Sequence, residues 1–134
     1  MSATKVLIVD DDAFLLDMYS IKFKESGFSV EIAQNGEEAV EKVKELNPDV
    51  ILLDIVMPKL DGFEVLRAFK KDKIAENALI IILTNLGQKE DIEKGLALGA
   101  ADYIIKAHFT PSEVVAKVKS LLARLPDGQE RKNK

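Results

Sequence analysis

Short apolar runs recur along the chain, and stretches with a helical period separate them. Each run has five or six residues, whereas the stretches between runs place apolar side chains three or four positions apart. The runs are KVLIV (5–9), FSVEIA (28–33), DVILL (49–53), ALIIIL (78–83) and ADYII (101–105). The helical apolar positions are Phe14, Leu15, Met18 and Ile21; Ala39, Val43 and Leu46; Val65, Leu66 and Phe69; Ile92 and Leu96; and Val114, Val118, Leu121 and Leu125. The pattern predicts five strands, each followed by a helix.

Capping signals support these helix boundaries. DGFE at 61–64 and TPSE at 110–113 each place a capping side chain three residues before a glutamate, and Asn35 offers a similar start. Gly27 and Gly99 fall where the first and fourth helices should end.

Alternating strands and helices predict a parallel sheet with right-handed crossovers, and therefore an α/β, doubly wound fold with five strands. The runs at 5–9, 49–53 and 78–83 are almost wholly apolar, as expected of strands that helices cover on both faces. The run at 28–33 alternates apolar and other residues, which is typical of an edge strand.

Composition narrows the class of protein. A chain of 134 residues with 47% apolar residues predicts one domain with a real core. We place that domain at 1–125 and expect the polar segment 126–134 to be disordered. The sequence has no cysteines, which excludes disulfides and thiolate metal sites. Its net charge of −4 lacks the positive charge typical of proteins that bind nucleic acid directly. No apolar run approaches the ~18 residues of a membrane span, and no signal peptide begins the chain, so we expect a cytoplasmic protein.

Polar residues follow the ends of the central runs. Asp10 and Asp11 come directly after the first run, Asp54 after the third, and Lys106 after the fifth, while Thr84 follows the fourth. In an open parallel sheet these ends share one edge, where ligands bind. We therefore expect three carboxylates, a hydroxyl and an ammonium group to converge in a shallow pocket.

Such a cluster suits a divalent cation and phosphoryl transfer. Clustered carboxylates repel one another, which raises pKa values unless a cation intervenes. Mg²⁺ takes a few carboxylates and leaves room for phosphate oxygens, and phosphoryl transfer needs mainly positioning and charge neutralisation. One aspartate would be the nucleophile and form an aspartyl phosphate. Lys106 would face a phosphate oxygen, and Thr84 would donate a hydrogen bond to another.

Four motifs resemble the receiver domain of two-component response regulators, in the single-domain form related to chemotaxis receivers. They are VLIVDDD, VILLDIVMPKLDG, IIILTN and DYIIKAHF, and the resemblance runs from about Lys5 to Leu125. It implies a flavodoxin-like (βα)5 fold with strand order 2-1-3-4-5. It also implies a phosphoprotein that accepts a phosphoryl group from a sensor histidine kinase or phosphotransfer protein and then binds a downstream output protein. Such a protein is not an enzyme beyond its own phosphorylation and dephosphorylation.

The resemblance also assigns roles to the site residues. Asp54 is the phosphorylated residue, and Asp10 and Asp11 hold Mg²⁺ with Asp54 and the backbone carbonyl of Val56 as further ligands. Thr84 is the switch hydroxyl, Lys106 contacts the phosphate, and Tyr103 is the aromatic residue that changes rotamer on activation. From its place before a helix, Asp12 is instead expected to be an N-cap, and the lone His108 to have no catalytic role.

Two departures from the family affect the expected site. Ala107 follows Lys106 where the family usually has a cis proline. A cis bond costs ~2.5–4 kcal/mol before other residues, against ~0.5–1 kcal/mol before proline, so either the bond is trans with a reshaped loop or the fold absorbs the strain. Val56 and Leu86 occupy the two positions that set phosphoryl lifetime in the family. Both are apolar and cannot orient an attacking water, so we expect slow dephosphorylation.

Other functions stay open at this stage. A phosphatase of the haloacid dehalogenase type would need an aspartate where Val56 stands, and a flavin-binding domain would need a phosphate loop in place of DDDAFLL. The main alternative is a receiver-like interaction module that is not phosphorylated. The expected oligomeric state is a monomer or a weak dimer through the face of the fourth and fifth helices.

Overall fold

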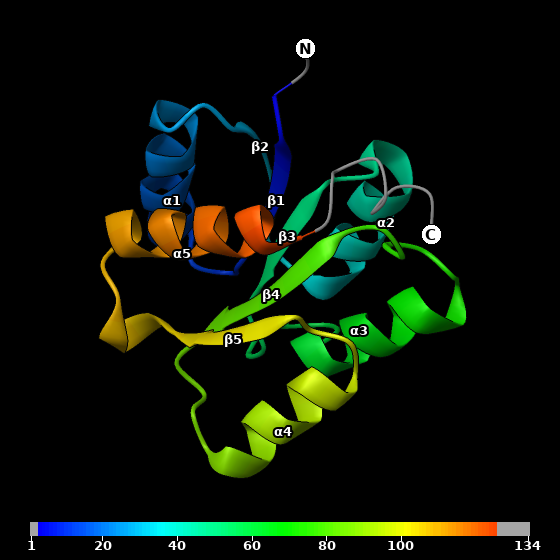
Figure 1. Cartoon of the computed structure of the whole chain (residues 1–134). Coiled ribbons are helices and arrows are strands. Elements are labelled where there is room, and N and C mark those ends of the chain that lie inside the picture. Colours follow the sequence, from blue (N-terminus) through cyan, green and yellow to red (C-terminus); the bar gives the residue numbers. More distant parts are fainter. Residues whose placement is uncertain (1–2, 126–134) are drawn as a thin grey trace.

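The computed structural model describes residues 3–125 as five alternating strand–helix pairs (Figure 1). The expected disorder of 126–134 lies outside these residues. The strands are β1 (Lys5–Val9), β2 (Ser29–Ala33), β3 (Val50–Leu53), β4 (Leu79–Thr84) and β5 (Asp102–Ile105). The helices are α1 (Ala13–Glu25), α2 (Gly36–Leu46), α3 (Gly62–Lys71), α4 (Lys89–Ala97) and α5 (Pro111–Arg124), and a short 3-10 helix, η1 (Lys106–His108), lies between β5 and α5.

The strands form one parallel sheet in the order β2-β1-β3-β4-β5, as the family resemblance implies. Val9 is opposite Ala33 on one side and Leu53 on the other, so the strand ends are in register. On the far side of the sheet, Thr84 is opposite Ile105. The predicted doubly wound fold and the edge position of the 28–33 run are confirmed.

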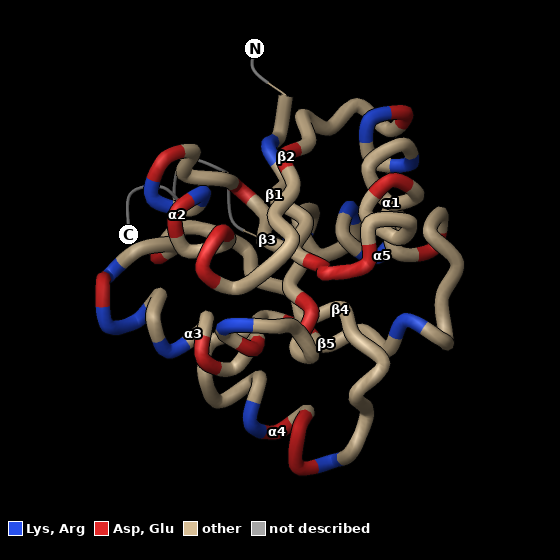
Figure 2. Tube along the Cα trace, turned by 180° about the vertical axis from the view of Figure 1, so that it is seen from behind, with Lys and Arg blue, Asp and Glu red and all other residues tan. Residues whose placement is uncertain are grey.

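Helices cover both faces of the sheet (Figure 1). One buried cluster joins alternate strand residues such as Val6, Leu52 and Ile81 to α1 and α5. The other joins the intervening residues, such as Leu7 and Ile51, to α2 and α3. Because each central strand contributes to both clusters, it must be apolar throughout, which explains the runs in the sequence. Figure 2 shows charged residues concentrated on the helices and connections.

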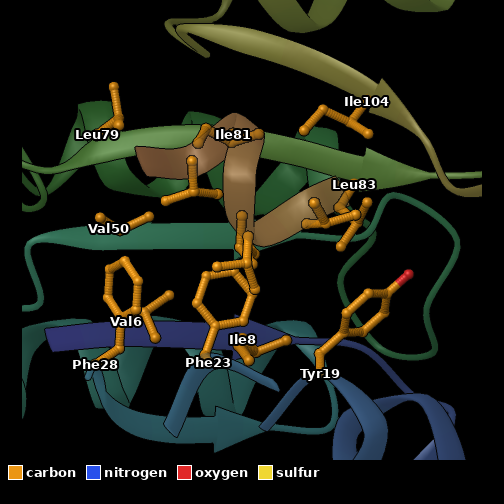
Figure 3. Close-up of a cluster of buried hydrophobic side chains, with 14 of the residues drawn as sticks. Val6, Ile8, Tyr19, Phe23, Phe28, Val50, Leu79, Ile81, Leu83 and Ile104 are labelled. Carbon is orange, nitrogen blue, oxygen red and sulfur yellow. The ribbon is translucent and has the colours of Figure 1, made fainter. Parts of the chain in front are cut away.

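The apolar face predicted for α1 is wrong at Phe14 and Ile21, whereas Leu15 packs against the core. The buried stripe consists of Leu16, Tyr19 and Phe23, whereas Phe14 is 69% exposed and Ile21 is 56% exposed. Figure 3 shows the rings of Phe23 and Phe28 side by side, against the side chains of the central strands. Their ring centroids are 5.1 Å apart in an edge-to-face arrangement. Both sets of residues have a helical spacing, but the set of Leu16, Tyr19 and Phe23 is the one that faces the core.

The predicted caps form. Asp61 and Thr110 each take part in a full capping box, and the Asn35 side chain accepts the N–H of Glu38. Gly27 and Gly99 follow the ends of α1 and α4 with φ angles of 95° and 113°, a conformation that glycine adopts without strain.

Close backbone contacts hold the segment between β3 and α3 against its neighbours. A Cβ atom at Gly36 would lie 2.3 Å from the carbonyl oxygen of Leu60, and one at Gly62 would lie 2.4 Å from the carbonyl oxygen of Asp54. The N–H of Gly62 also donates to the carbonyl of Ile55 at 2.8 Å. These contacts fix the path of the chain directly after Asp54. Within residues 3–125, no helix has the length and apolar character needed to cross a bilayer.

Candidate functional site

The carboxyl ends of the central strands bring Asp10, Asp54 and Thr84 to one edge of the sheet. The N–H of Asp10 donates to Ala33 at 3.1 Å, and the N–H of Asp54 donates to Val9 at 3.0 Å. The parallel ladder therefore extends through both aspartates and fixes their backbones. Asp10, Asp54 and Thr84 are 2%, 6% and 1% exposed, which is unusual for polar side chains and requires specific partners.

Three carboxylates meet at this edge. Asp10, Asp11 and Asp54 each offer an oxygen, and these oxygens lie within 4.8 Å of one another. Asp10 and Asp54 are buried and Asp11 is exposed. The group therefore has a buried floor and an exposed rim. Hard oxygen ligands in this arrangement fit Mg²⁺, which binds a few carboxylates and keeps several waters.

Lys106 reaches the two buried carboxylates from the end of β5. Its Nζ atom lies 2.5 Å from Asp10 Oδ2 and 3.0 Å from Asp54 Oδ2. The three side chains are 10%, 3% and 8% exposed respectively. No cis peptide bond occurs in residues 3–125, so the Lys106–Ala107 bond is trans and the loop forms η1. With Ala107 in this position, Lys106 still lies against Asp54.

The pKa values of Asp10 and Lys106 are both raised. Burial raises the pKa of Asp10, and the hydrogen bond from Lys106 offsets this only in part. Burial lowers the pKa of Lys106, but its hydrogen bonds to Asp10 and Asp54 and the charges of these two carboxylates together raise it by more. Two buried carboxylates share one ammonium group, so negative charge is in excess and bound cations are favoured.

A cavity of about 330 Å³ opens beside the carboxylates. Its lining residues are Asp54, Val56, Thr84, Asn85, Leu86 and Lys106. Thr84 Oγ1 accepts the N–H of Leu86 at 3.4 Å. Val56 is 63% exposed, so its side chain offers an apolar rim to the cavity. The cavity thus brings together a carboxylate, a hydroxyl and an ammonium group.

Tyr103 lies outside this lining but connects to it. Its hydroxyl donates to the carbonyl oxygen of Leu86, and a Cβ atom at Gly95 would lie 3.2 Å from its ring. Burial is the main cause that raises the pKa of Tyr103 to about 12. The ring therefore packs between α4 and the segment that follows Thr84.

Asp12 and His108 lie near the site but do not line the cavity. The Asp12 side chain accepts the N–H groups of Phe14 and Leu15, which confirms its role as the N-cap of α1. Its own N–H donates to Asp10 Oδ1 at 2.9 Å, which orients that carboxylate. His108 ends η1 and does not line the cavity.

Sequence reasoning missed Asn85. Its Oδ1 accepts the N–H of Ala107 at 2.9 Å, and the residue lines the cavity. Two features of the sequence could have indicated this contact. Asn85 has an amide side chain directly after Thr84, and Ala107, unlike a proline, has a backbone N–H that can donate.

The fold and this site define a class of protein. Residues 6–119 match the family model of the response regulator receiver domain. The chain therefore belongs to the response regulator receiver domain family, as the resemblance of its four motifs indicated.

The chain is similar in sequence and in structure to individual response regulators. The chain is 40% identical over 121 residues to the transcriptional regulatory protein ResD of Bacillus subtilis, covering 90% of this chain and 49% of that protein. The receiver domain of the Francisella response regulator 1452 has a TM-score of 0.81 at 36% identity, covering 90% of this chain and 98% of that one. A chain of the CheX-CheY-BeF3-Mg²⁺ complex of Borrelia burgdorferi has a TM-score of 0.78 at 36% identity, covering 88% of each chain.

These relatives bear on the expected partners. The chain spans about half the length of the curated relatives it matches. Several of them are named as transcriptional or DNA-binding regulators. The expectation of no direct nucleic acid partner is therefore not supported by the comparisons.

Proposed function

We propose that this protein is a phosphoacceptor of a two-component system and that Asp54 receives the phosphoryl group. The observation that carries the proposal is the buried group formed by Asp54, Asp10 and Lys106 at the carboxyl edge of the sheet. Membership of the receiver family supports it. An Asp54 carboxylate oxygen attacks the phosphorus of a kinase phosphohistidine, a P–O bond forms, and the P–N bond breaks as the imidazole leaves.

Asp10, Asp11 and Asp54 would hold Mg²⁺, with the Val56 carbonyl as the further ligand that the family resemblance implies. When bound, the ion neutralises negative charge on the carboxylates and on the phosphoryl oxygens. The protein's own groups do the positioning. Lys106 holds one Asp54 oxygen, the N–H of Ile55 donates to the other at 2.7 Å, and both contacts orient the nucleophile.

Thr84 and Tyr103 form the proposed switch. Leu86 links them, because its N–H donates to Thr84 and its carbonyl accepts from Tyr103. A movement of Thr84 toward a phosphoryl group would pull on Leu86 and so change the packing of Tyr103 against α4. The altered surface of α4, β5 and α5 would then bind the output partner.

The remaining assignments are part of the same proposal. The receiver domain is placed at 1–125, its phosphoryl source is a sensor histidine kinase or phosphotransfer protein, and its location is the cytoplasm. Its output acts through a downstream protein or through further parts of a longer regulator of the kind seen among its relatives. Whether it is a monomer or a weak dimer stays a prediction.

Intact mass after incubation with Mg²⁺ and acetyl phosphate tests the proposal. We expect one added phosphoryl group that is absent with EDTA and absent in Asp54→Asn. Asp49→Asn is a control carboxylate at the opposite end of β3. If neither acetyl phosphate nor a panel of histidine kinases gives an adduct, the protein is an unphosphorylated interaction module. Steady turnover of small phosphoesters would instead make it a phosphatase.

A further inference from the structure

The pairing of β4 and β5 ends at the cavity, directly before Lys106. The last pair in the ladder between β4 and β5 is Thr84 with Ile105. The next residue of one strand, Asn85, starts the loop to α4, and the next residue of the other, Lys106, starts η1. The sheet ladder therefore does not fix Lys106 relative to Thr84.

Asn85 supplies a bond across this gap. Its Oδ1 accepts the N–H of Ala107 at 2.9 Å and so joins residues 22 positions apart. Because a backbone N–H needs an acceptor, the carboxamide oxygen must face Ala107, and the Nδ2 group lies on the other side of the amide. The bond lies one residue beyond Lys106, whose flexible stem must place Nζ against two carboxylates.

We propose that Asn85 is a positioning residue for phosphoryl transfer. Its carboxamide holds the start of η1 against the segment after Thr84 and thereby keeps the Lys106 ammonium group at Asp10 and Asp54. The inference rests on the proposed phosphorylation of Asp54. A competing role is direct contact, in which Asn85 Nδ2 donates to a phosphoryl oxygen without acting through Lys106.

Three variants separate these roles. Asn85→Ala removes the acceptor, Asn85→Asp keeps an acceptor but loses the Nδ2 donor, and Gln88→Ala changes an exposed amide in the same loop that makes no side-chain cap bond. Far-ultraviolet circular dichroism checks that each variant is folded. Three quantities are measured in the full chain: hydrogen exchange of the Ala107 amide by NMR, acylation of Lys106 by peptide mass spectrometry, and phosphorylation by acetyl phosphate with Mg²⁺.

In Asn85→Ala we expect Ala107 exchange and Lys106 acylation to rise, and the phosphorylation rate to fall, each by about 2- to 10-fold, the factor associated with one neutral hydrogen bond. Asn85→Asp should keep the exchange and acylation rates of the unmodified protein, and Gln88→Ala should change none of the three.

The first two readouts do not depend on phosphorylation, so the inference and the proposed function can fail separately. If Asn85→Ala leaves Ala107 exchange and Lys106 acylation unchanged, Asn85 does not position Lys106. A fall in phosphorylation without a change in Lys106 acylation would assign Asn85 to direct phosphoryl contact and overturn the positioning role. An unphosphorylated parent protein would refute the function alone.

Discussion

Replacing Lys106 by alanine should destabilise the fold, and Mg²⁺ should reverse most of the loss. The ammonium group lies 2.5 Å and 3.0 Å from two carboxylates, in side chains that are at most 10% exposed. At an effective dielectric constant of about 20, one such pair gives about 6 kcal/mol of gross attraction, and desolvation of the charges offsets much of it. Removing one partner of a buried pair costs about 3–5 kcal/mol. We expect Lys106→Ala to lose about 3 kcal/mol of unfolding free energy without Mg²⁺.

Mg²⁺ should stabilise the variant because the same carboxylates bind it. A ligand at 100 times its dissociation constant adds about 2.7 kcal/mol to the unfolding free energy. The variant should also bind Mg²⁺ more tightly than the unmodified protein, since no ammonium group then competes for Asp10 and Asp54. Urea unfolding followed by circular dichroism, with and without Mg²⁺, measures both effects.

Lys22→Ala is the matched control. Lys22 pairs with Glu25 at 3.7 Å, but both side chains are largely exposed, so its loss should change stability by less than about 0.5 kcal/mol. A Lys106→Ala variant as stable as the unmodified protein would refute the electrostatic reasoning. A loss of stability that saturating Mg²⁺ leaves untouched would show that the stem packing of Lys106, and not its charge, supports the fold.

Three further predictions concern the surroundings of the site. Val56→Asn combined with Leu86→Glu should speed the loss of the phosphoryl group, measured as the decay of the phosphorylated mass. An unchanged decay would show that these apolar cavity residues do not set the lifetime of the phosphoryl group. Gly36→Ala should lower the unfolding free energy by about 1–3 kcal/mol in urea, because its new Cβ atom would lie 2.3 Å from a backbone oxygen. Tyr19→Phe leaves Tyr103 as the single tyrosine, and its ultraviolet titration should have a midpoint near pH 12 and not near pH 10. Because the pKa of Tyr103 is higher in the folded than in the unfolded protein, the stability that this residue contributes is lost as pH rises from about 10 through 12.

The sequence predicted the fold well because its signals were local and redundant. The run at 49–53, which is apolar apart from Asp49, is typical of a strand covered on both faces, and the capping boxes at Asp61 and Thr110 mark helix starts independently. The face of α1 was mispredicted because two stripes have a helical period. Period alone cannot choose between Phe14 with Ile21 and the stripe of Leu16 and Phe23, since burial depends on how the helix lies on the sheet.

The site was predictable as far as strand ends determine it. Asp10, Asp54 and Thr84 are placed by the sheet ladder, so their positions follow from the fold. The contact between Asn85 and Ala107 joins two connections beyond the ladder. Its geometry depends on the trans bond at Ala107 and the turn of η1, and neither the spacing nor the composition of the sequence contains that information.

The arrangement of charge suggests why a lysine and a metal ion would both be needed. An ammonium group has three N–H donors, and Lys106 already directs two of them to Asp10 and Asp54. A phosphoryl group on Asp54 would add negative charge to a site where the carboxylates already outnumber the cation. Lys106 alone could then balance Asp10 or the phosphoryl oxygens, but not both. Asp11, on the exposed rim, completes a set of oxygens for a second cation without further burial of charge. On this reasoning, phosphorylation without Mg²⁺ should fail even when Lys106 is in place.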